Sequence, residues 1–354
     1  MKRLFALASL VAWLSACSAQ PAGNRPGQVK VISHTPALSF VHWADPLENA
    51  FSSDVPSGWR TSGGLTRRSP IDTRSAIESV SADGQVRVAM GDAEFSSFMV
   101  PNPMLDATGF REGSRYPNGY GGFIPVMRHR PGIQFAEEYV RTKATAGCTG
   151  LAVTDRRERP ELSESINRIL ATMPGVNLQL TTGEVNFTCT QAGQPMRGYY
   201  FAGTIFSQTS NGMAMWFLQH LYGYLAPAGK AAVAQAALRR LISAHRVNPS
   251  WAAMQSSATM RASEIMAQSN AEISKIIGDT YWNRARSLDS TFRNDANARR
   301  GTTDVADPNT GESWNIYGGH RYYWRIPGSD TIIGTDVPNP PAGNAVLLHE
   351  LQAP

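Results

Sequence analysis

The order of strand-forming and helix-forming segments constrains the fold of this chain more than any other feature. Residues 176–191 and 196–208 are rich in β-branched and aromatic side chains, which predicts a run of antiparallel strands. An alanine-rich segment at 228–247 follows them and predicts a helix with Leu238 and Leu241 on one side. The chain therefore leads from paired strands directly into a helix that can cover them.

Shorter elements precede this pair of strands. Residues 30–100 alternate between short strand-forming runs and turns, and helices are predicted at 131–143 and 163–173. Strands, helices, more strands and a closing helix are typical of an α+β fold with an antiparallel sheet and packed helices. We expect this domain to cover residues 30–251.

A long amphipathic helical segment is predicted at 252–300. Its apolar side chains recur at helical spacing and form one stripe, which consists of Ile265, Ile273, Ile277, Tyr281, Leu288 and Phe292. We expect this stripe to pack on its own domain, and the alternative is a coiled coil with a partner.

Residues 301–354 are expected to form a β-meander and tail. Turn signals at DPNTG, at the glycine pair 318–319 and at PGSD separate three predicted strands at 312–317, 320–326 and 330–335. The fold class is therefore α+β, followed by a long helix and a C-terminal three-stranded β-meander.

Side chains of a strand alternate between its two faces, which predicts one candidate binding surface in the meander. The apolar face, with Tyr322 and Trp324, must be covered, because a small sheet is not stable alone. The opposite face is the candidate surface, and it holds Tyr317, Arg321, Tyr323 and Arg325. Such a face suits stacking on sugar rings or pairing with carboxylate or phosphate, and the alternative is a solvated face.

The first sixteen residues have the layout of a secretory signal. Lys2 and Arg3 precede an apolar run at 4–14 and then small residues. As a helix this run spans about 16 Å, far short of the roughly 30 Å of membrane hydrocarbon. We expect cleavage after residue 16 and a flexible tether at 17–29.

The residues Leu14, Ser15, Ala16 and Cys17 resemble the lipobox of bacterial lipoproteins. The resemblance implies a diacylglyceryl thioether on Cys17 and a further acyl chain, such as palmitate, on its amino group. Several acyl chains together hold a protein firmly on a membrane. The alternative is an ordinary secretory signal with a chance cysteine.

Ser18, which follows the lipobox where aspartate would retain a lipoprotein in the inner membrane, favours the outer membrane, with the body facing the periplasm. Removal of Lys2 and Arg3 lowers the formal net charge from +5 to +3. A mild charge without a long basic run does not favour nucleic acid as a partner. The expected partners are the membrane, through the lipid, and an envelope protein or glycan.

The chain has three cysteines, and lipidation of Cys17 leaves Cys148 and Cys189 as a pair. An oxidising compartment favours a disulfide between them. The bridge would close a loop of about 40 residues and stabilise the fold by about 4 kcal/mol. The alternative is two buried free thiols.

Two short motifs carry a resemblance to the PsbP-like fold. FSSDVPSGW at 51–59 resembles the opening turn of that fold, and HRVNPSW at 245–251 resembles its closing strand. The resemblance covers about residues 38–251. It implies an accessory or binding protein and no reaction.

No catalytic or metal-binding motif stands out, and no cofactor is expected. The seven histidines are scattered and lack the spacing of zinc ligands, while Asp307, Asn309 and Gly311 begin like a calcium loop that lacks its later positions. We expect a non-catalytic, lipid-anchored envelope protein that binds or supports another component. The alternative is an envelope hydrolase that acts on cell-wall or lipid material. A deep pocket with His220 or His245 beside a serine or carboxylate would favour this alternative.

Overall fold

The computed structural model describes residues 27–35, 37–69, 72–95, 97–119, 122–173, 176–210, 212–255, 270, 272–277 and 300–350. The predicted signal peptide, Cys17 and the tether up to residue 26 lie outside these residues. So does most of the predicted helix at 252–300. Of its residues, 252–255, 270, 272–277 and 300 are described, and all of these except 254 and 255 are helical.

The protein is a mixed α+β structure with mostly antiparallel sheets, as the sequence predicts. Its largest sheet has eight strands in the order β11-β12-β13-β14-β7-β6-β5, with β8 paired to β14. These strands are β5 (Arg60–Ser69), β6 (Asp72–Val80), β7 (Arg87–Met90), β8 (Phe98–Met99), β11 (Thr149–Glu158), β12 (Val176–Gln191), β13 (Gln194–Thr209) and β14 (Ala214–Pro227).

Two smaller sheets flank the large one. A three-stranded sheet is formed by β3 (Phe40–Ala44), β4 (Phe51–Pro56) and β15 (Arg246–Val247), and a hairpin by β9 (Arg115–Pro117) and β10 (Phe123–Pro125). The helices are α1 (Pro103–Ala107), α2 (Gly132–Tyr139) with a π-turn η1 (Val140–Ala144), α3 (Pro160–Leu170), η2 (Ala228–Lys230), α4 (Ala231–Ser243) and α5 (Pro249–Ala253).

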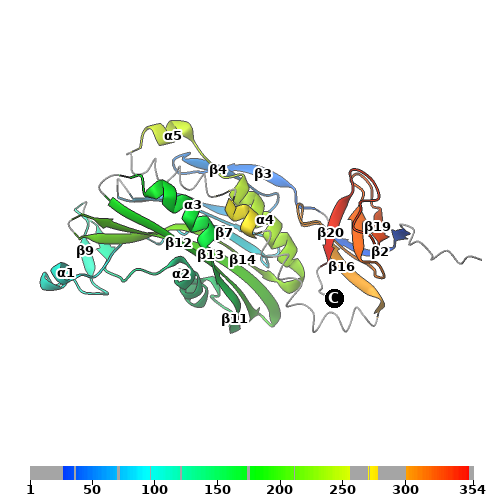
Figure 1. The fold of residues 1–354 in the computed structure, drawn as a ribbon, viewed down its shortest axis with the longest axis horizontal. Helices are drawn as coiled ribbons and strands as arrows, with labels where there is room; N and C mark the ends of the chain where they lie inside the picture. The colour runs from blue at the N-terminus through cyan, green and yellow to red at the C-terminus, as the bar shows by residue number, and fades with distance from the viewer. Residues whose placement is uncertain are drawn as a thin grey trace, which may run out of the picture.

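Helices cover both faces of the large sheet. Figure 1 shows α3 and α4 on one face, and α2 against the other. Buried alanines on α4, such as Ala234 and Ala237, let that helix approach the sheet closely, while Leu238 and Leu241 fill the space between them. The predicted helices at 131–143, 163–173 and 228–247 are therefore present, with shifted ends.

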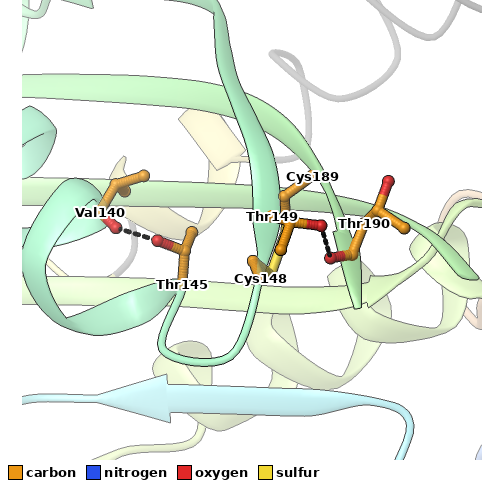
Figure 2. Close-up of a disulfide and its surroundings, with 6 residues drawn as sticks. All are labelled: Val140, Thr145, Cys148, Thr149, Cys189 and Thr190. Atoms are coloured by element: carbon orange, nitrogen blue, oxygen red, sulfur yellow. Dashed lines mark hydrogen bonds between the residues drawn. A yellow bond between two sulfur atoms is a disulfide. The ribbon is translucent and has the colours of Figure 1, made fainter. Parts of the chain in front are cut away.

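The predicted disulfide is confirmed, because Cys148 and Cys189 are bonded with their Cα atoms 5.8 Å apart. Figure 2 shows the bridge between the start of β11 and the end of β12, beside the hydrogen bond from Thr149 Oγ1 to the Thr190 carbonyl oxygen. It fixes an outer strand of the large sheet to its neighbour.

The C-terminal part forms a seven-stranded sheet in the order β1-β19-β18-β20-β16-β17-β2. Its strands are β1 (Gly27–Val29), β2 (Val31–Thr35), β16 (Thr302–Ala306), β17 (Ser313–Tyr317), β18 (Tyr322–Arg325), β19 (Ile332–Thr335) and β20 (Val346–Glu350). The last three residues of the predicted tether, 27–29, are therefore a strand of this sheet.

The three predicted meander strands exist, but they do not pair in sequence order. β17 pairs with β16 and β2, whereas β18 pairs with β19 and β20. The Asp307–Gly311 turn joins β16 to β17, and β2 takes the other edge of β17. Because both edges of β17 are occupied, the glycine pair 318–319 connects two separated strands and is not a hairpin turn.

The C-terminal sheet lies at one end of the long axis, beyond the end of α4 (Figure 1). Arg239 of α4 donates a hydrogen bond of 2.7 Å to the carbonyl oxygen of Pro308. Gly311 lies so close to α4 that a Cβ atom there would come within 2.7 Å of the Ala236 Cβ. The two parts of the molecule therefore touch through the β16–β17 turn.

Candidate functional site

The large sheet is split at the end of its shortest inner strand. β7 pairs with residues 77–80 of β6 and residues 222–225 of β14, and then the chain leaves the sheet. Gly91 ends β7 with a φ of +73°, and a Cβ atom there would come within 2.1 Å of the Ser75 carbonyl oxygen. Beyond this point β6 and β14 have no strand between them.

A pocket of about 230 Å³ occupies this gap between β6 and β14. Its apolar lining is mainly aromatic and aliphatic, and comprises Ala50, Phe51, Leu65, Met90, Phe95, Phe217, Leu218, Leu221, Tyr222, Val247 and Trp251. Its polar lining comprises Asp72, Thr73, Arg74, Ser75, Asp92, Ser97, Gln219 and His245, together with Gly91. An apolar cavity with a few polar groups is the usual form of a small-molecule site.

Arg74 crosses the gap from β6 to β14. Its Nη1 donates to the Leu218 carbonyl oxygen at 2.9 Å, and its Nη2 donates to Ser97 Oγ at 3.0 Å. Its Nε lies 2.7 Å from Asp72 Oδ1, and the guanidinium lies 5.6 Å from the centre of the Phe217 ring. The side chain holds the two strands at a fixed separation.

A loop fixed by one buried carboxylate forms another part of the wall. Asp45 is 3% exposed, and its two oxygens accept hydrogen bonds of 3.0 to 3.2 Å from four backbone N–H groups. The donors are Leu47, Glu48, Ala50 and Leu65. Because Ala50 and Leu65 line the pocket, Asp45 sets the position of that wall.

The segment after α4 brings His245 and Trp251 to the pocket. Val247 pairs with Phe51 of β4, and Asn248 then caps α5 by accepting a 3.0 Å hydrogen bond from the Ser250 N–H. The short strand and the capped helix hold His245, Val247 and Trp251 in the lining of the pocket.

His245 lines the pocket and makes no side-chain hydrogen bond to the described residues. It is 2% exposed, and neither Nδ1 nor Nε2 has a hydrogen-bond partner among the described residues. Its ring centre lies 5.3 Å from that of Phe51. Buried polar groups are nearly always paired, so two buried, unpaired nitrogens in a residue that lines the pocket make His245 a candidate ligand-binding residue.

Burial and, to a smaller extent, the positive charge of Arg246 together lower the pKa of His245 to about 4. The imidazole is therefore neutral at pH 7, with one nitrogen that donates and one that accepts. The charged side chains of the lining are Asp72, Arg74 and Asp92. Asp72 pairs with Arg74, and Asp92 lies 2.7 Å from Lys143 Nζ and accepts from the Tyr139 hydroxyl at 2.8 Å.

His220 lies in the core beside the pocket and does not line it. It is 1% exposed, and its Nδ1 lies 3.1 Å from the hydroxyl of Tyr222, which donates to Asn270 Oδ1 at 2.8 Å. Burial lowers the pKa of His220 to about 3. Of the two histidines considered for a hydrolase, only His245 lines the pocket.

The four residues of the predicted binding face do not share an exposed surface. Tyr317 is 46% exposed and Arg321 is exposed, but Tyr323 is 1% exposed in the core with Trp314 and Ile316. The expected exposure of Tyr323 was wrong, because β17 and β18 are not neighbours and β18 is covered on both faces. Whether Tyr317 and Arg321 bind anything stays a prediction.

Arg325, the fourth residue of that face, is held by its own sheet. Its Nη1 lies 2.8 Å from Glu312 Oε2, and its Nη2 lies 3.2 Å from Asp307 Oδ2. Glu312 also contacts His34 Nε2 at 2.6 Å. The guanidinium of Arg325 is therefore paired within its own sheet. These side chains border a hollow of about 220 Å³.

A second buried ionic cluster is centred on Glu184. Glu184 is fully buried, and it accepts from Arg159 Nη2 at 2.6 Å and from the Tyr199 hydroxyl at 2.8 Å. Burial raises the pKa of Tyr199, and the neighbouring Glu184 charge raises it further. The cluster joins α3's start to β12 and β13, which is a structural role.

Within the described ranges, no group of three histidine, cysteine, aspartate or glutamate side chains is arranged to hold a metal ion. No helix in those ranges is long and apolar enough to cross a membrane. In comparisons with known proteins, the chain matches no protein-family model and no curated protein.

Sequence reasoning missed the pocket. The motif HRVNPSW did mark the segment that carries His245 and Trp251, but as a closing strand. The pair Asn248 and Pro249 is the signal that could have corrected this prediction. Such a pair starts a helix, here α5, and therefore limits the strand before it to Arg246 and Val247.

Proposed function

We propose that the protein is a lipid-anchored, non-catalytic binding protein of the bacterial cell envelope that holds a small molecule in the pocket between β6 and β14. The observation that carries the binding function is the pair of unpartnered nitrogens of His245, a residue of a largely apolar pocket whose charged side chains are paired. The lipid anchor rests on the lipobox resemblance at Cys17.

The same residue supports binding over hydrolysis. A hydrolase of the serine type needs a histidine within hydrogen-bond reach of a nucleophile, and usually a carboxylate on its other nitrogen. Neither nitrogen of His245 has such a partner in the described part of the chain. Its low pKa also makes His245 a poor general base near neutral pH.

The binding function is tested on the full chain purified from its own membranes. Mass spectrometry under native conditions should find a form heavier than the polypeptide and its lipid, and unfolding should release the difference as a small molecule. Identical masses before and after unfolding, in protein that is folded by circular dichroism, would contradict the proposal.

The anchor is tested separately by Cys17→Ala. We expect this variant to leave the membrane pellet, while Cys148→Ser, which also removes one cysteine, stays in it. An unmodified mature terminus in the wild type, or membrane retention of Cys17→Ala, would remove the lipid part of the proposal and leave the pocket untouched.

A further inference from the structure

The lining of the pocket restricts the charge of its ligand. Arg74 is paired with Asp72, and Asp92 with Lys143, both at 2.7 Å. A charged ligand would lose its water without gaining an unpaired opposite charge in the wall, which is unfavourable in an enclosed site. The site therefore favours an uncharged molecule.

The aromatic lining restricts its shape. Phe51, Phe217, Tyr222 and Trp251 come from β4, β14 and α5 and line the same pocket. Such rings favour a flat partner that packs against their faces or edges. The volume of about 230 Å³ exceeds the roughly 150 Å³ of a cavity that binds benzene, and lies below the roughly 300–1,000 Å³ of drug-sized pockets. One or two fused rings fit this range.

His245 restricts the polar group of the ligand. The neutral imidazole offers one donor and one acceptor, and the described residues satisfy neither. A hydroxyl or an amide can both donate and accept, so it suits either nitrogen whichever of them carries the hydrogen. A purely apolar ligand would leave both nitrogens unpaired in the closed site.

We propose that the pocket between β6 and β14 takes an uncharged, planar ligand of one or two rings with a hydroxyl or amide group. We further propose that His245, whose ring nitrogens are buried but held by no hydrogen bond to the described residues, turns toward the pocket and binds this group. The inference rests on the proposed binding function and adds the chemical class of the ligand.

Three probes with the same fused rings test the proposal on the full-length protein. They are naphthol, methylnaphthalene and naphthoate, which place a hydroxyl, a methyl and a carboxylate at the same ring position. In calorimetric titrations we expect naphthol to bind about tenfold more tightly than methylnaphthalene, because only the hydroxyl satisfies His245. We expect naphthoate to bind more weakly than naphthol by at least about tenfold.

Variants assign the preference to one side chain. In His245→Phe, naphthol should lose its advantage and bind like methylnaphthalene, whose affinity should hold or rise. His245→Gln retains a donor and an acceptor and should keep part of the preference for naphthol. His42→Phe makes the same change at an exposed histidine outside the pocket and should bind all probes as the wild type does.

The proposal is overturned if naphthoate binds best, if naphthol and methylnaphthalene bind equally, if His245→Phe keeps the naphthol preference, or if no probe binds at millimolar concentration. These failures can be told apart from failure of the binding function. A co-purified ligand that carries a charge would refute the inference alone, whereas the absence of both a co-purified ligand and any probe binding would refute both.

Discussion

At the residue scale, His245 departs from the rule that buried polar groups in a stable protein are paired by hydrogen bonds. A buried polar group without a partner costs about 1–3 kcal/mol, and ligand-free protein bears this cost at His245. We therefore expect His245→Phe to raise the free energy of unfolding by about 1 kcal/mol at pH 7, because the new ring packs beside Phe51 and carries no unpaired polar atom. Urea unfolding measures this change.

The matched variant His42→Phe should change the free energy of unfolding by no more than about 0.5 kcal/mol, because the side chain of His42 is 70% exposed. If His245→Phe instead lost more than about 1 kcal/mol, His245 would have a structural role and its nitrogens would have partners in solution.

The same histidine makes stability depend on pH. Unfolded His245 titrates near 6.5 and folded His245 near 4, so between these values the unfolded chain binds more protons. The free energy of unfolding should therefore fall as the pH drops from about 6.5 to about 4, by roughly 3 kcal/mol from this residue. His220, whose pKa burial lowers to about 3, adds a loss of the same sign.

Urea titrations at several pH values measure this slope. His245→Phe should be shallower than the wild type between pH 6.5 and 4 but should keep the part that belongs to His220. Equal slopes in the two proteins would show that His245 is protonated, or solvated, in the folded state.

At the scale of elements, the loop after β3 is held by Asp45. Replacing Asp45 with alanine leaves four backbone N–H groups without their acceptor, so Asp45→Ala should lower the free energy of unfolding by about 3 kcal/mol. Asp83→Ala, at a side chain 46% exposed and paired with Lys230, should cost less than about 1 kcal/mol. Equal losses in the two variants would refute the role of Asp45.

The disulfide makes a second prediction at this scale. It closes a loop with a sequence separation of 41 residues, so Cys148→Ser should cost about 4 kcal/mol, and the oxidised wild type should migrate faster than the variant in a non-reducing gel. The difference in migration should vanish under reducing conditions. Equal migration before reduction would mean that the bridge does not form in the native protein.

Local patterns in the sequence predicted the helices and the two long strands β12 and β13 of the large sheet, but not β11 or β14. Strands at 176–191 and 196–208 and the helix around Leu238 depend on side chains that are close in sequence, so periodicity finds them. The gap beside β7 depends on which distant strands pair and where one of them ends, and no local pattern contains that information. The burial of Tyr323 was mispredicted for the same reason, because it follows from the partners of β18.

At the scale of the whole molecule, the first described strands belong to the last sheet. β1 and β2 pair with β19 and β17, so the N-terminal lipid would lie near the C-terminal sheet. Nine residues separate Cys17 from Gly27, and the extended chain between the two reaches at most about 35 Å. In Figure 1, α1 and the β9–β10 hairpin lie at the opposite end of the long axis.

This arrangement predicts how the anchored protein lies on a membrane. With a fluorescent label attached through Arg321→Cys or through Phe123→Cys, a quencher in the lipid head groups should quench the label at 321 more strongly. Both positions are exposed, one in the C-terminal sheet and one in the β9–β10 hairpin. Stronger quenching at 123 would mean that the other end of the molecule faces the bilayer.

The central claim is that the ring nitrogens of His245, which have no partner among the described residues, form a hydrogen bond when a ligand enters the pocket. The most direct measurement is the nuclear magnetic resonance spectrum of the histidine ring nitrogens at pH 7, recorded without and with saturating naphthol. The account predicts a neutral His245 ring whose nitrogen signals move on binding, while those of exposed His42 stay in place. A charged ring in the free protein, or His245 signals that do not move at saturation, would contradict it.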